Sequence, residues 1–323
     1  MDLKTIIAPI QAHLDRFEHE FTAMFQSNVP LIDRMADHLI RTKGKRLRPV
    51  LVLLSAATHG VPSFDVIRSA AIIELIHTAT LVHDDVVDRA PLRRGQPSLN
   101  SIWDNHISVL MGDFLLAKAL NLIVLLNEPD LMVKIAKCTE QLSKGELLQA
   151  TRGFDADITE EEYFQIIGEK TASLVATGCE VGAYLTSRSR EQADRFRQFG
   201  ECLGLAFQIT DDLLDFTGDQ NTVGKPIGND VAEGTVTLPL IHALKEAPAV
   251  EAERIAGLMD GDWNPAARQE VGAFAFKYGG IEYAKLRAAE LANDAKAILA
   301  EKGDSPYTLS LCAMVDYAIA RDR

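Results

Sequence analysis

The sequence is poor in features that mark secreted or zinc-binding domains. Its 323 residues contain four cysteines, with no close pairing and no spacing typical of metal ligands: Cys138, Cys179, Cys202 and Cys312. The segment from Met1 to Pro9 lacks the charged-then-apolar pattern of a signal peptide. We therefore expect a cytoplasmic protein whose cysteines are buried thiols outside disulfides, and we expect no zinc site.

Positive charge and long apolar runs are also scarce. With 33 lysines and arginines against 46 aspartates and glutamates, the formal net charge is −13, which argues against a nucleic-acid partner. The apolar segment Leu115–Leu126 is interrupted by Lys118 and is shorter than the ~20 residues that a membrane-spanning helix needs. The sequence therefore predicts no transmembrane segment.

The chain also lacks a linker. Its composition, 47% hydrophobic and 24% charged, is typical of a soluble globular protein with a large core. Length alone would allow about two domains. Because no Pro/Gly/Ser-rich stretch or change in composition divides the sequence, we expect a single domain over residues 1–323.

Apolar residues recur at helical spacing along most of the chain. A helix within residues 1–28 has one apolar stripe, which indicates either core packing or a subunit contact: Ile6, Ile10, Leu14, Phe17, Phe21 and Phe25. Residues Ser101–Asn127 are apolar on nearly all sides, which predicts one long central helix. Thr159 and Glu162 have the spacing of a capping box at the start of another helix. The pattern predicts an all-α fold.

Two Asp-Asp-x-x-Asp motifs lie at the ends of apolar helical segments. In the first, Asp84 and Asp88 are four residues apart, so their carboxylates lie on one face of a helix; Asp211 and Asp215 repeat this spacing. Like charges at that spacing destabilise a helix, so we expect a cation to hold each pair. Mg²⁺ is the natural candidate, because it binds oxygen ligands and is commonly shared between one or two carboxylates and substrate phosphates.

Cations stand close to the first motif. Arg93 and Arg94 follow it, and guanidinium groups match the geometry of phosphate oxygens. Lys45 and Arg48 belong to a run of four cations before an apolar helix, which indicates either a solvated loop or the rim of a pocket. A single aspartate motif is more often a solvated acidic turn. Two such motifs, each followed by basic residues, favour a diphosphate-binding site.

These motifs resemble, in order, those of the trans-polyprenyl diphosphate synthases, and the resemblance covers most of the chain. The matching stretches are Gly44–Pro49, Glu74–Asp88, Arg93–Gly95, Gly112–Phe114, Gly145–Glu146, Lys170–Ala172, the second aspartate motif and Gly224–Asp230. The resemblance implies an isoprenoid synthase-type helical bundle around a deep central cavity, with the two motifs facing each other across it. It also implies a homodimer.

The resemblance further implies a prenyltransferase of isoprenoid biosynthesis. Its reaction would be the Mg²⁺-dependent, head-to-tail condensation of isopentenyl diphosphate with an allylic prenyl diphosphate. By resemblance, isopentenyl diphosphate binds Lys45, Arg48, His77 and Arg94. The allylic diphosphate binds Arg93, Lys170, Thr171, Gln208 and Lys225. The metal ligands come from Asp84, Asp85, Asp88, Asp211, Asp212 and Asp215. Catalysis depends on Asp84, Asp88, Asp211, Lys170 and Lys225.

The residues before the first motif bear on product length. Family members with short products commonly have an aromatic residue about one turn before the first aspartate, where this chain has the small residues Ala79 and Thr80. We therefore expect a tunnel that continues past them, lined by Ile72, Ile73, Ile76, Leu120 and Ile123. A long all-trans product, octaprenyl to decaprenyl, follows, of the kind attached to a quinone ring.

One departure from the family pattern lies in a glycine-rich segment, Thr222–Thr237, which we interpret as a lid over bound phosphates. Many relatives have lysine where this chain has Thr235. The change removes a cation that could touch a diphosphate, so it affects the details of lid closure rather than the reaction.

Three alternatives remain open from the sequence. The first is a short-chain synthase that makes farnesyl or geranylgeranyl diphosphate. The second is a class I terpene cyclase, which needs no second substrate site and would leave Lys45, Arg48 and Arg94 without a role. The third is a noncatalytic helical subunit, which predicts decayed motifs, whereas both motifs are intact here.

Overall fold

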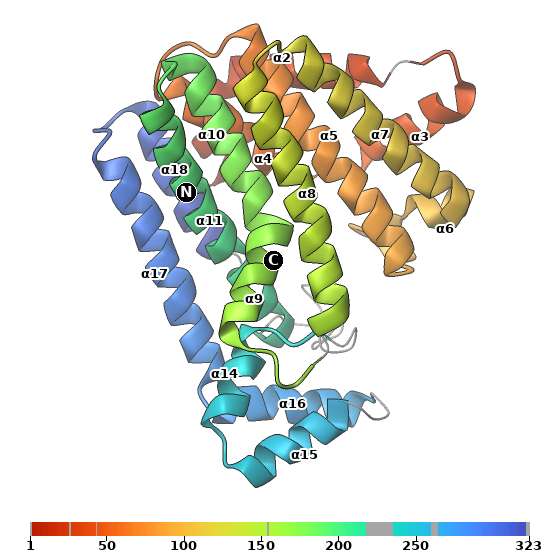
Figure 1. The fold of residues 1–323 in the computed structure, drawn as a ribbon, viewed down its shortest axis with the longest axis vertical. Coiled ribbons are helices and arrows are strands. Elements are labelled where there is room, and N and C mark those ends of the chain that lie inside the picture. Colours follow the sequence, from red (N-terminus) through yellow and green to blue (C-terminus); the bar gives the residue numbers. More distant parts are fainter. Residues whose placement is uncertain are drawn as a thin grey trace. The chain divides into compact units, whose positions relative to one another are not determined.

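The computed structural model describes residues 2–25, 27–42, 44–153, 155–217, 235–259 and 264–320. The predicted lid lies outside the described residues as far as residue 234, and so does Lys225. Within the described part of the chain, nearly every element is a helix (Figure 1), and the one sheet is a two-stranded hairpin. The prediction of an all-α fold is confirmed.

The chain divides into two compact units. The first comprises Met1–Thr139, Leu174–Arg197 and Lys302–Leu311, and the second comprises Glu140–Ser173, Gln198–Glu301 and Cys312–Arg323. Four helices have residues in both units, because a unit boundary falls inside each of them: α8 (Pro129–Arg152), α10 (Ser173–Ser187), α11 (Arg190–Thr217) and α18 (Pro306–Ile319). The single domain over residues 1–323 stays a prediction.

The first unit is built around helix α5. Besides the helices shared with the second unit, its elements are α1 (Leu3–Ile7), η1 (Ala8–Ile10), α2 (Gln11–Met24), α3 (Pro30–Arg41), α4 (Leu47–Ala57), α5 (Phe64–Val87), β1 (Leu92–Arg93), β2 (Gln96–Pro97), α6 (Leu99–Trp103) and α7 (Asn105–Leu125). Helix α5 packs against α2, α4, α6 and α7, and it runs beside α7 in Figure 1. Most of its side chains are buried, so it forms the core of this unit.

Two details of this core follow from the sequence. The N-terminal apolar stripe is buried throughout, so it serves core packing, and Pro9 lies in the short 3₁₀ turn η1 that separates α1 from α2. On α10, Gly182 has no room for a Cβ, because the backbone of Val52 on α4 lies against it. Small residues thus allow α4 and α10 to approach closely.

The second unit has its own apolar core. Its further elements are α9 (Glu160–Ile167), η2 (Gly168–Ala172), α14 (Leu238–Glu246), α15 (Ala249–Met259), α16 (Pro265–Lys277) and α17 (Gly280–Ala300). Helix α14 packs against α9, α16 and α17, and buried residues such as Tyr163, Leu213, Leu240 and Phe274 form one cluster. The predicted capping box is confirmed: Thr159 accepts from the Glu162 backbone N–H, and the Glu162 side chain accepts from that of Thr159.

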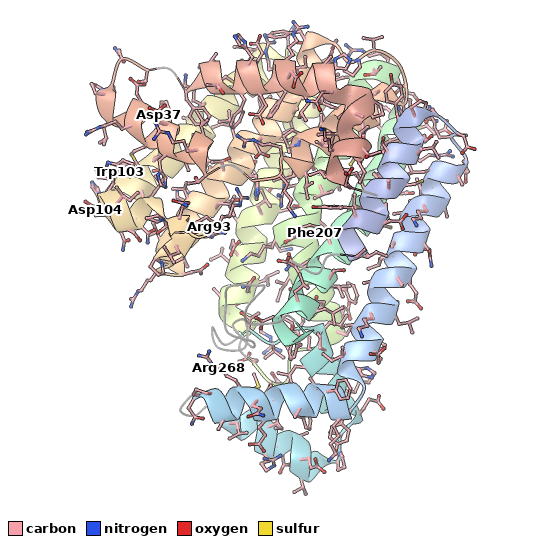
Figure 2. The ribbon with its side chains drawn as sticks, turned by 180° about the vertical axis from the view of Figure 1, so that it is seen from behind. Asp37, Arg93, Trp103, Asp104, Phe207 and Arg268 are labelled. Atoms are coloured by element: carbon pink, nitrogen blue, oxygen red, sulfur yellow. The ribbon has the colours of Figure 1, made fainter. Side chains whose placement is uncertain are left out.

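The predicted long helix over Ser101–Asn127 is wrong in two respects. Asp104, with a φ of 77°, separates α6 from α7 and caps α7 by accepting a hydrogen bond from the Ile107 N–H at 3.0 Å. Figure 2 labels Asp104 and Trp103 at this bend. The helix is also not central on all sides, because Leu110, Leu120 and Val124 are 51%, 59% and 61% exposed in this single chain.

Among the described residues, α5 and α7 are long and apolar enough to cross a membrane. Within the apolar window, 67% of α5 but only 33% of α7 is buried inside the structure. A mostly buried core helix passes the same test of length and composition, and α5 is a mostly buried core helix of the first unit. These two helices are therefore weak indications of a membrane segment.

Candidate active site

The first aspartate motif lies at the C-terminal end of α5. Asp84 is half-buried, Asp88 is exposed at the C-cap, and the last turn of the helix has no basic residue. Backbone carbonyl groups give a helix C-terminus a partial negative charge, which disfavours carboxylates there. This end of α5 is therefore a place where a bound cation stabilises the structure.

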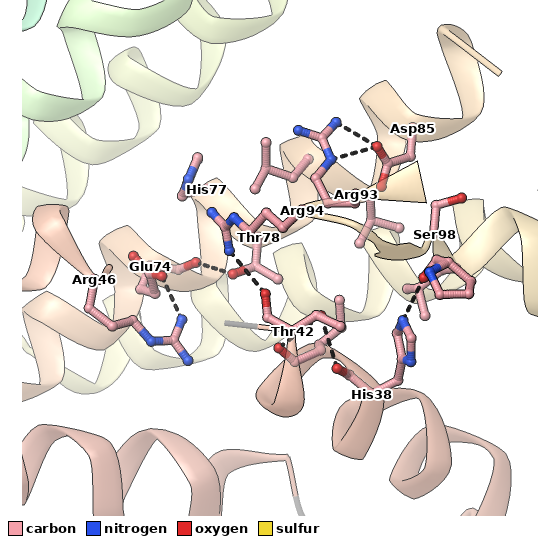
Figure 3. Close-up of a pocket in the computed structure, with 15 residues that line it drawn as sticks. His38, Thr42, Arg46, Glu74, His77, Thr78, Asp85, Arg93, Arg94 and Ser98 are labelled. Atoms are coloured by element: carbon pink, nitrogen blue, oxygen red, sulfur yellow. Dashed lines mark hydrogen bonds and ion pairs between the residues drawn. The ribbon is translucent and has the colours of Figure 1, made fainter. Parts of the chain in front are cut away.

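The middle aspartate of the motif has a different environment. Asp85 is 5% exposed, and its Oδ1 accepts a hydrogen bond from Arg93 Nε at 2.7 Å and forms an ion pair with Arg93 Nη2 at 2.5 Å. Figure 3 shows this pair at one edge of a pocket. Asp85 thus orients Arg93, whose position the sequence could not assign.

The segment with the two arginines is a two-stranded β-hairpin. Leu92 pairs with Pro97 and Arg93 with Gln96, which leaves Arg94 and Gly95 as a two-residue turn with φ of 53° and 73°. Positive φ at both positions is characteristic of a type I′ turn, and glycine adopts it without strain. The glycine of the Arg-Arg-Gly motif is therefore required by backbone geometry.

The hairpin is attached to helix α3 and the loop after it. Arg94 Nη1 donates to the Thr42 carbonyl at 3.1 Å, and its guanidinium lies against Gly44, where a Cβ would collide with it. His38 Nε2 donates to the Pro97 carbonyl at 2.8 Å. These contacts hold the Arg94 guanidinium beside Gly44, in the loop before α4.

Arg48 and His77 form a direct contact. Arg48 Nη1 donates to His77 Nε2 at 2.9 Å, so this ring nitrogen is the acceptor and the neutral ring has its proton on Nδ1. Burial, with further contributions from Arg48 and Arg94, lowers the pKa of His77 well below its usual value. The Nε of Arg48 is buried with no hydrogen-bond partner, which is unusual for a donor of this strength.

Arg46 belongs to the same cationic run, but the sequence reasoning missed its role. It is 9% exposed, has a φ of 53°, and donates to Glu74 Oε1 at 2.5 Å. Its guanidinium also lies 4.6 Å from the centre of the Phe21 ring. The available signal is Glu74, a lone acid within the apolar run of α5 that requires a buried partner.

One pocket of the first unit joins these groups. Its lining includes Arg46, Glu74, His77, Asp85, Arg93 and Arg94, as Figure 3 shows, and it extends to His38 and Thr42 of helix α3 and its end. Of the residues predicted for isopentenyl diphosphate, His77 and Arg94 lie in this lining and Arg48 contacts His77, whereas Lys45 is exposed. The lining has three guanidinium groups and two carboxylates, and this net positive charge favours an anionic ligand.

The Gly-Asp-Phe stretch contacts the residue before the first motif. His83 lies against Gly112, where there is no room for a Cβ, and His83 Nε2 is 3.4 Å from Asp113 Oδ1 and 3.2 Å from the Val109 carbonyl. Helix α7 therefore fixes the position of His83 next to Asp84.

The second unit has its own group of predicted residues, beginning with Lys170. The chain forms a π-helical segment, η2, between the helices α9 and α10. Lys170 lies in η2 and its Nζ donates to Glu146 Oε2 at 2.9 Å. A Cβ at Gly145 would lie 2.5 Å from the Lys170 backbone nitrogen, so the Gly-Glu stretch permits this approach. Single π-helical turns are frequent at functional sites.

A chain of hydrogen bonds connects η2 to the second aspartate motif. Thr171 Oγ1 donates to Gln208 Oε1 at 2.8 Å, and Gln208 Nε2 donates to Asp212 Oδ1 at 2.8 Å. Tyr163 Oη donates to the other oxygen, Oδ2, at 2.6 Å. Burial raises the pKa of Asp212 to about 7, against the effect of the two donors. Tyr163 is a further residue that the sequence reasoning missed.

The outer aspartates of the second motif differ from the middle one. Asp211 is exposed and Asp215 is half-exposed, whereas Asp212 is 4% exposed. The last turn of α11 has no basic residue, as in α5. Within the described residues, no group of three or more His, Cys, Asp or Glu side chains could hold a metal ion by itself. Mg²⁺ commonly needs only one or two carboxylates beside phosphate oxygens.

The positions predicted to set product length lie on α5. Ala79 is fully buried, and Thr80 is half-buried with its hydroxyl donating to the His77 carbonyl at 2.9 Å. Four of the five predicted tunnel residues are buried: Ile72, Ile73, Ile76 and Ile123. The fifth, Leu120 on α7, is 59% exposed. Leu120 therefore does not line an internal tunnel in this single chain.

A family model described as Polyprenyl synthetase matches residues 29–271. The chain is 36% identical to the all-trans-nonaprenyl-diphosphate synthase (geranyl-diphosphate specific) of Rhodobacter capsulatus, over 98% of this chain and 97% of that protein. It is 34% identical to the short chain isoprenyl diphosphate synthase of Methanothermobacter thermautotrophicus, over 90% of each. Overall identity therefore does not separate long from short products.

The fold of the chain is also that of a solved polyprenyl synthase structure. A polyprenyl synthase from Caulobacter crescentus CB15, complexed with calcium and isoprenyl diphosphate, superposes with a TM-score of 0.92 at 35% identity. The match covers 100% of this chain and 98% of that chain. The likeness thus extends over both described units and includes a relative that binds a divalent cation.

Proposed function

The chain belongs to the polyprenyl synthetase family, and from this premise we propose that it joins isopentenyl diphosphate, head to tail, to an allylic prenyl diphosphate with release of pyrophosphate. One observation supports this best. Each unit has a helix that ends in an aspartate motif without basic residues, near side chains that can hold a diphosphate: His77 and Arg94 in the first unit and Lys170 in the second.

The first unit is proposed to bind isopentenyl diphosphate. Arg48 has a buried Nε without a partner, and a diphosphate oxygen would supply the missing acceptor. His77 is neutral and donates from Nδ1, because its Nε2 accepts from Arg48. Arg94 is held in place by the hairpin, and the exposed Lys45 completes the set. These groups would orient the double bond as the nucleophile.

The donor set of the two helix ends fits Mg²⁺. We propose Asp84, Asp88, Asp211 and Asp215 as its ligands, because their carboxylates crowd helix C-termini where a cation is favourable. Asp85 and Asp212, which the sequence also places among the ligands, are buried against protein donors and are proposed to position other side chains instead. When bound, Mg²⁺ neutralises charge on the leaving diphosphate.

The allylic diphosphate is proposed to bind Arg93 and Lys170, together with Lys225 outside the described residues. Their charges would stabilise the pyrophosphate as the carbon–oxygen bond breaks, and Thr171 and Gln208 would direct oxygen dipoles at the allylic cation. The double bond of isopentenyl diphosphate then forms the new carbon–carbon bond, and the departing pyrophosphate takes the proton. Apolar walls must exclude water, which would convert the cation to an alcohol.

The product is proposed to be a long all-trans chain, octaprenyl to decaprenyl, suited to a quinone side chain. Ala79 and Thr80 are both small, so neither places a bulky side chain in the way of a product that grows along α5. Replacing Ala79 with phenylalanine should shorten the product, because an aromatic ring there would block that route. Thr80→Phe is the companion variant one residue on, and unchanged products in both variants would refute the tunnel.

We infer that the active protein is a homodimer. Leu110, Leu120 and Val124 form an exposed apolar face on α7, which a second copy of the chain would cover. Leu120→Glu should give monomers in sedimentation, whereas Val250→Glu, at a residue 79% exposed on α15, should leave the dimer intact. A cytoplasmic location is supported by four cysteines, none of which is in a disulfide.

The test of function is a product assay. Purified protein is incubated with Mg²⁺, labelled isopentenyl diphosphate and farnesyl diphosphate, and the dephosphorylated products are separated by length. A ladder ending between octaprenyl and decaprenyl establishes the reaction and the long tunnel. Products that stop at farnesyl or geranylgeranyl length preserve the chemistry and refute the tunnel, and the absence of elongation refutes the proposed function.

A further inference from the structure

The hydrogen bonds around Asp212 run in a defined direction. Tyr163 Oη donates to Asp212 Oδ2 at 2.6 Å, and Gln208 Nε2 donates to Oδ1 at 2.8 Å. The amide oxygen of Gln208 in turn accepts the hydroxyl proton of Thr171 at 2.8 Å. Asp212 and Tyr163 are 4% and 3% exposed. Both donor chains therefore end at one buried carboxylate, which lies away from the exposed Asp211.

We propose that Asp212 and Tyr163 are positioning residues that set the polarity of the Gln208 and Thr171 dipoles. This inference rests on the proposed function, in which those two dipoles stabilise an allylic cation. In this arrangement both Asp212 oxygens accept, Oδ2 from Tyr163 and Oδ1 from the Gln208 amide nitrogen, so the Gln208 amide oxygen is turned toward Thr171. The Thr171 hydroxyl proton is then used in the hydrogen bond to Gln208. The lone pairs of the Thr171 oxygen face away from Gln208 and can stabilise the allylic cation.

The opposite polarity would work against the reaction. With the Gln208 amide reversed, its nitrogen would donate to Thr171, and the Thr171 hydroxyl proton would be directed elsewhere, including toward the cation. An O–H or N–H dipole with its positive end toward a carbocation raises the energy of that cation. Because the cation exists only after the carbon–oxygen bond begins to break, the correct polarity lowers the barrier and leaves substrate binding unchanged.

Tyr163 supplies the second half of the arrangement. A buried carboxylate oxygen without a hydrogen bond lowers the stability of the folded protein. Without the Tyr163 hydroxyl, the Asp212 side chain would therefore rotate or bind other donors. By occupying Oδ2, the Tyr163 hydroxyl leaves Oδ1 facing Gln208. Tyr163 lies on α9, directly before η2, so one short segment of chain positions both ends of the network.

The first experiment compares Tyr163→Phe with the wild-type enzyme. Removal of one hydroxyl should lower kcat about tenfold, the effect of one lost hydrogen bond, with the KM for farnesyl diphosphate changed less than about twofold. The fraction of farnesyl diphosphate converted to the alcohol rather than to elongated product should rise. Tyr283→Phe is the matched control, because Tyr283 also donates to an acid of this unit, Glu160, and should change neither quantity.

The binding of two unreactive analogues tests the orientation of the Thr171 and Gln208 dipoles without turnover. A tertiary-ammonium analogue of the farnesyl cation, added with pyrophosphate, should bind about tenfold more weakly to Tyr163→Phe, as expected for one hydrogen bond. The unreactive thio-analogue of farnesyl diphosphate, which is neutral at the reacting carbon, should bind equally well to both proteins. Equal weakening for both probes, or a lower melting temperature that accounts for the loss, indicates a merely structural role and overturns the proposal.

A double-mutant cycle tests the route of the effect. If Tyr163 acts through Gln208 and Thr171, then Tyr163→Phe should have little further effect on kcat in a Thr171→Val background. Asp212→Asn should retain more activity than Asp212→Ala, because an asparagine oxygen can still accept from Gln208 while its nitrogen donates to the Tyr163 oxygen. Additive effects would overturn the inference. Failure of the wild-type protein to elongate farnesyl diphosphate would instead refute the proposed function.

Discussion

The two units hold the same aspartate motif in different surroundings. In the first unit, the middle aspartate, Asp85, is paired with the charged guanidinium of Arg93, and two further guanidinium groups line the adjacent pocket. In the second unit, the middle aspartate, Asp212, accepts from the neutral groups of Tyr163 and Gln208. Identical motifs therefore differ in the charge of their neighbours.

This difference indicates a division of roles. Guanidinium groups around a pocket suit a ligand that is anionic before and after reaction. Neutral dipoles suit a charge that appears only during reaction, because they cost little when the charge is absent. The motif itself is therefore a poor guide to what each unit contributes, and the residues packed against its middle aspartate are a better one.

The largest expected effects come from the outer aspartates, in which the two units should agree. Asp84→Ala and Asp211→Ala should each lower turnover by several orders of magnitude with folding intact, because each would remove a ligand for the metal that neutralises the leaving group. Asp37→Ala, at an exposed position on α3, is the matched control. Near-normal turnover in both active-site variants would contradict the two-motif site.

The variant Arg48→Ala should distinguish the substrate-binding roles of the two units. Loss of a charged donor costs about 1.5–3 kcal/mol, so the KM for isopentenyl diphosphate should rise roughly 10- to 150-fold. The KM for the allylic diphosphate should change little. Steady-state kinetics with each substrate varied in turn would measure both values. Arg190→Ala removes an exposed arginine paired with Asp130 and should change neither; a loss confined to kcat in Arg48→Ala would argue against the division of roles.

The pH dependence of stability should reveal His77 in the first unit. Its folded pKa lies well below the unfolded value of 6.5, so the unfolded chain takes up a proton that the folded chain refuses. The contribution of His77 to the free energy of unfolding should therefore be fully present above pH 6.5. It should fall as the pH drops below 6.5, by up to about 1.4 kcal/mol per pH unit. Urea unfolding from pH 8 to 5 measures this, and His77→Gln should reduce the slope. An unchanged slope would show that folding does not lower the pKa of His77.

The smallest effect concerns the hairpin, which the second unit lacks among its described residues. Gly95→Ala should cost about 1 kcal/mol, because its φ of 73° is strained for an L-residue although no atom lies within 4 Å of the added Cβ. Gly272→Ala on α16 meets no atom either, but should stabilise, since alanine is favoured within a helix. Thermal melts distinguish the two, and equal shifts would refute the strain.

Much of the site was accessible from the sequence because its signals are local. The i, i+4 spacing places Asp84 with Asp88 on one face of a helix, and the capping box at Thr159 and Glu162 has the geometry that its residues predict. The apolar stripe from Ile6 to Phe25 is buried as its spacing indicates. Each of these patterns depends on spacings of three or four residues between successive members.

Other features depend on packing between distant segments. Asp85 and Asp212 follow their neighbours by one residue, about 100° around the helix, and so point into the protein instead of along the motif face. Whether they meet Arg93 or Tyr163 depends on contacts over 8 and 49 residues of chain. No local pattern encodes such partners.

The sequence by itself determined the helical class, the family, the two aspartate motifs and the cations that accompany them, because periodicity and motif order are properties of the chain alone. Tertiary structure decided the π-helical turn at Lys170, the exposed face of α7, the buried role of Arg46 and the direction of the hydrogen bonds at Asp212. The physical reason is that burial and hydrogen-bond partners are set by which segments pack together, and only the folded chain brings those segments into contact.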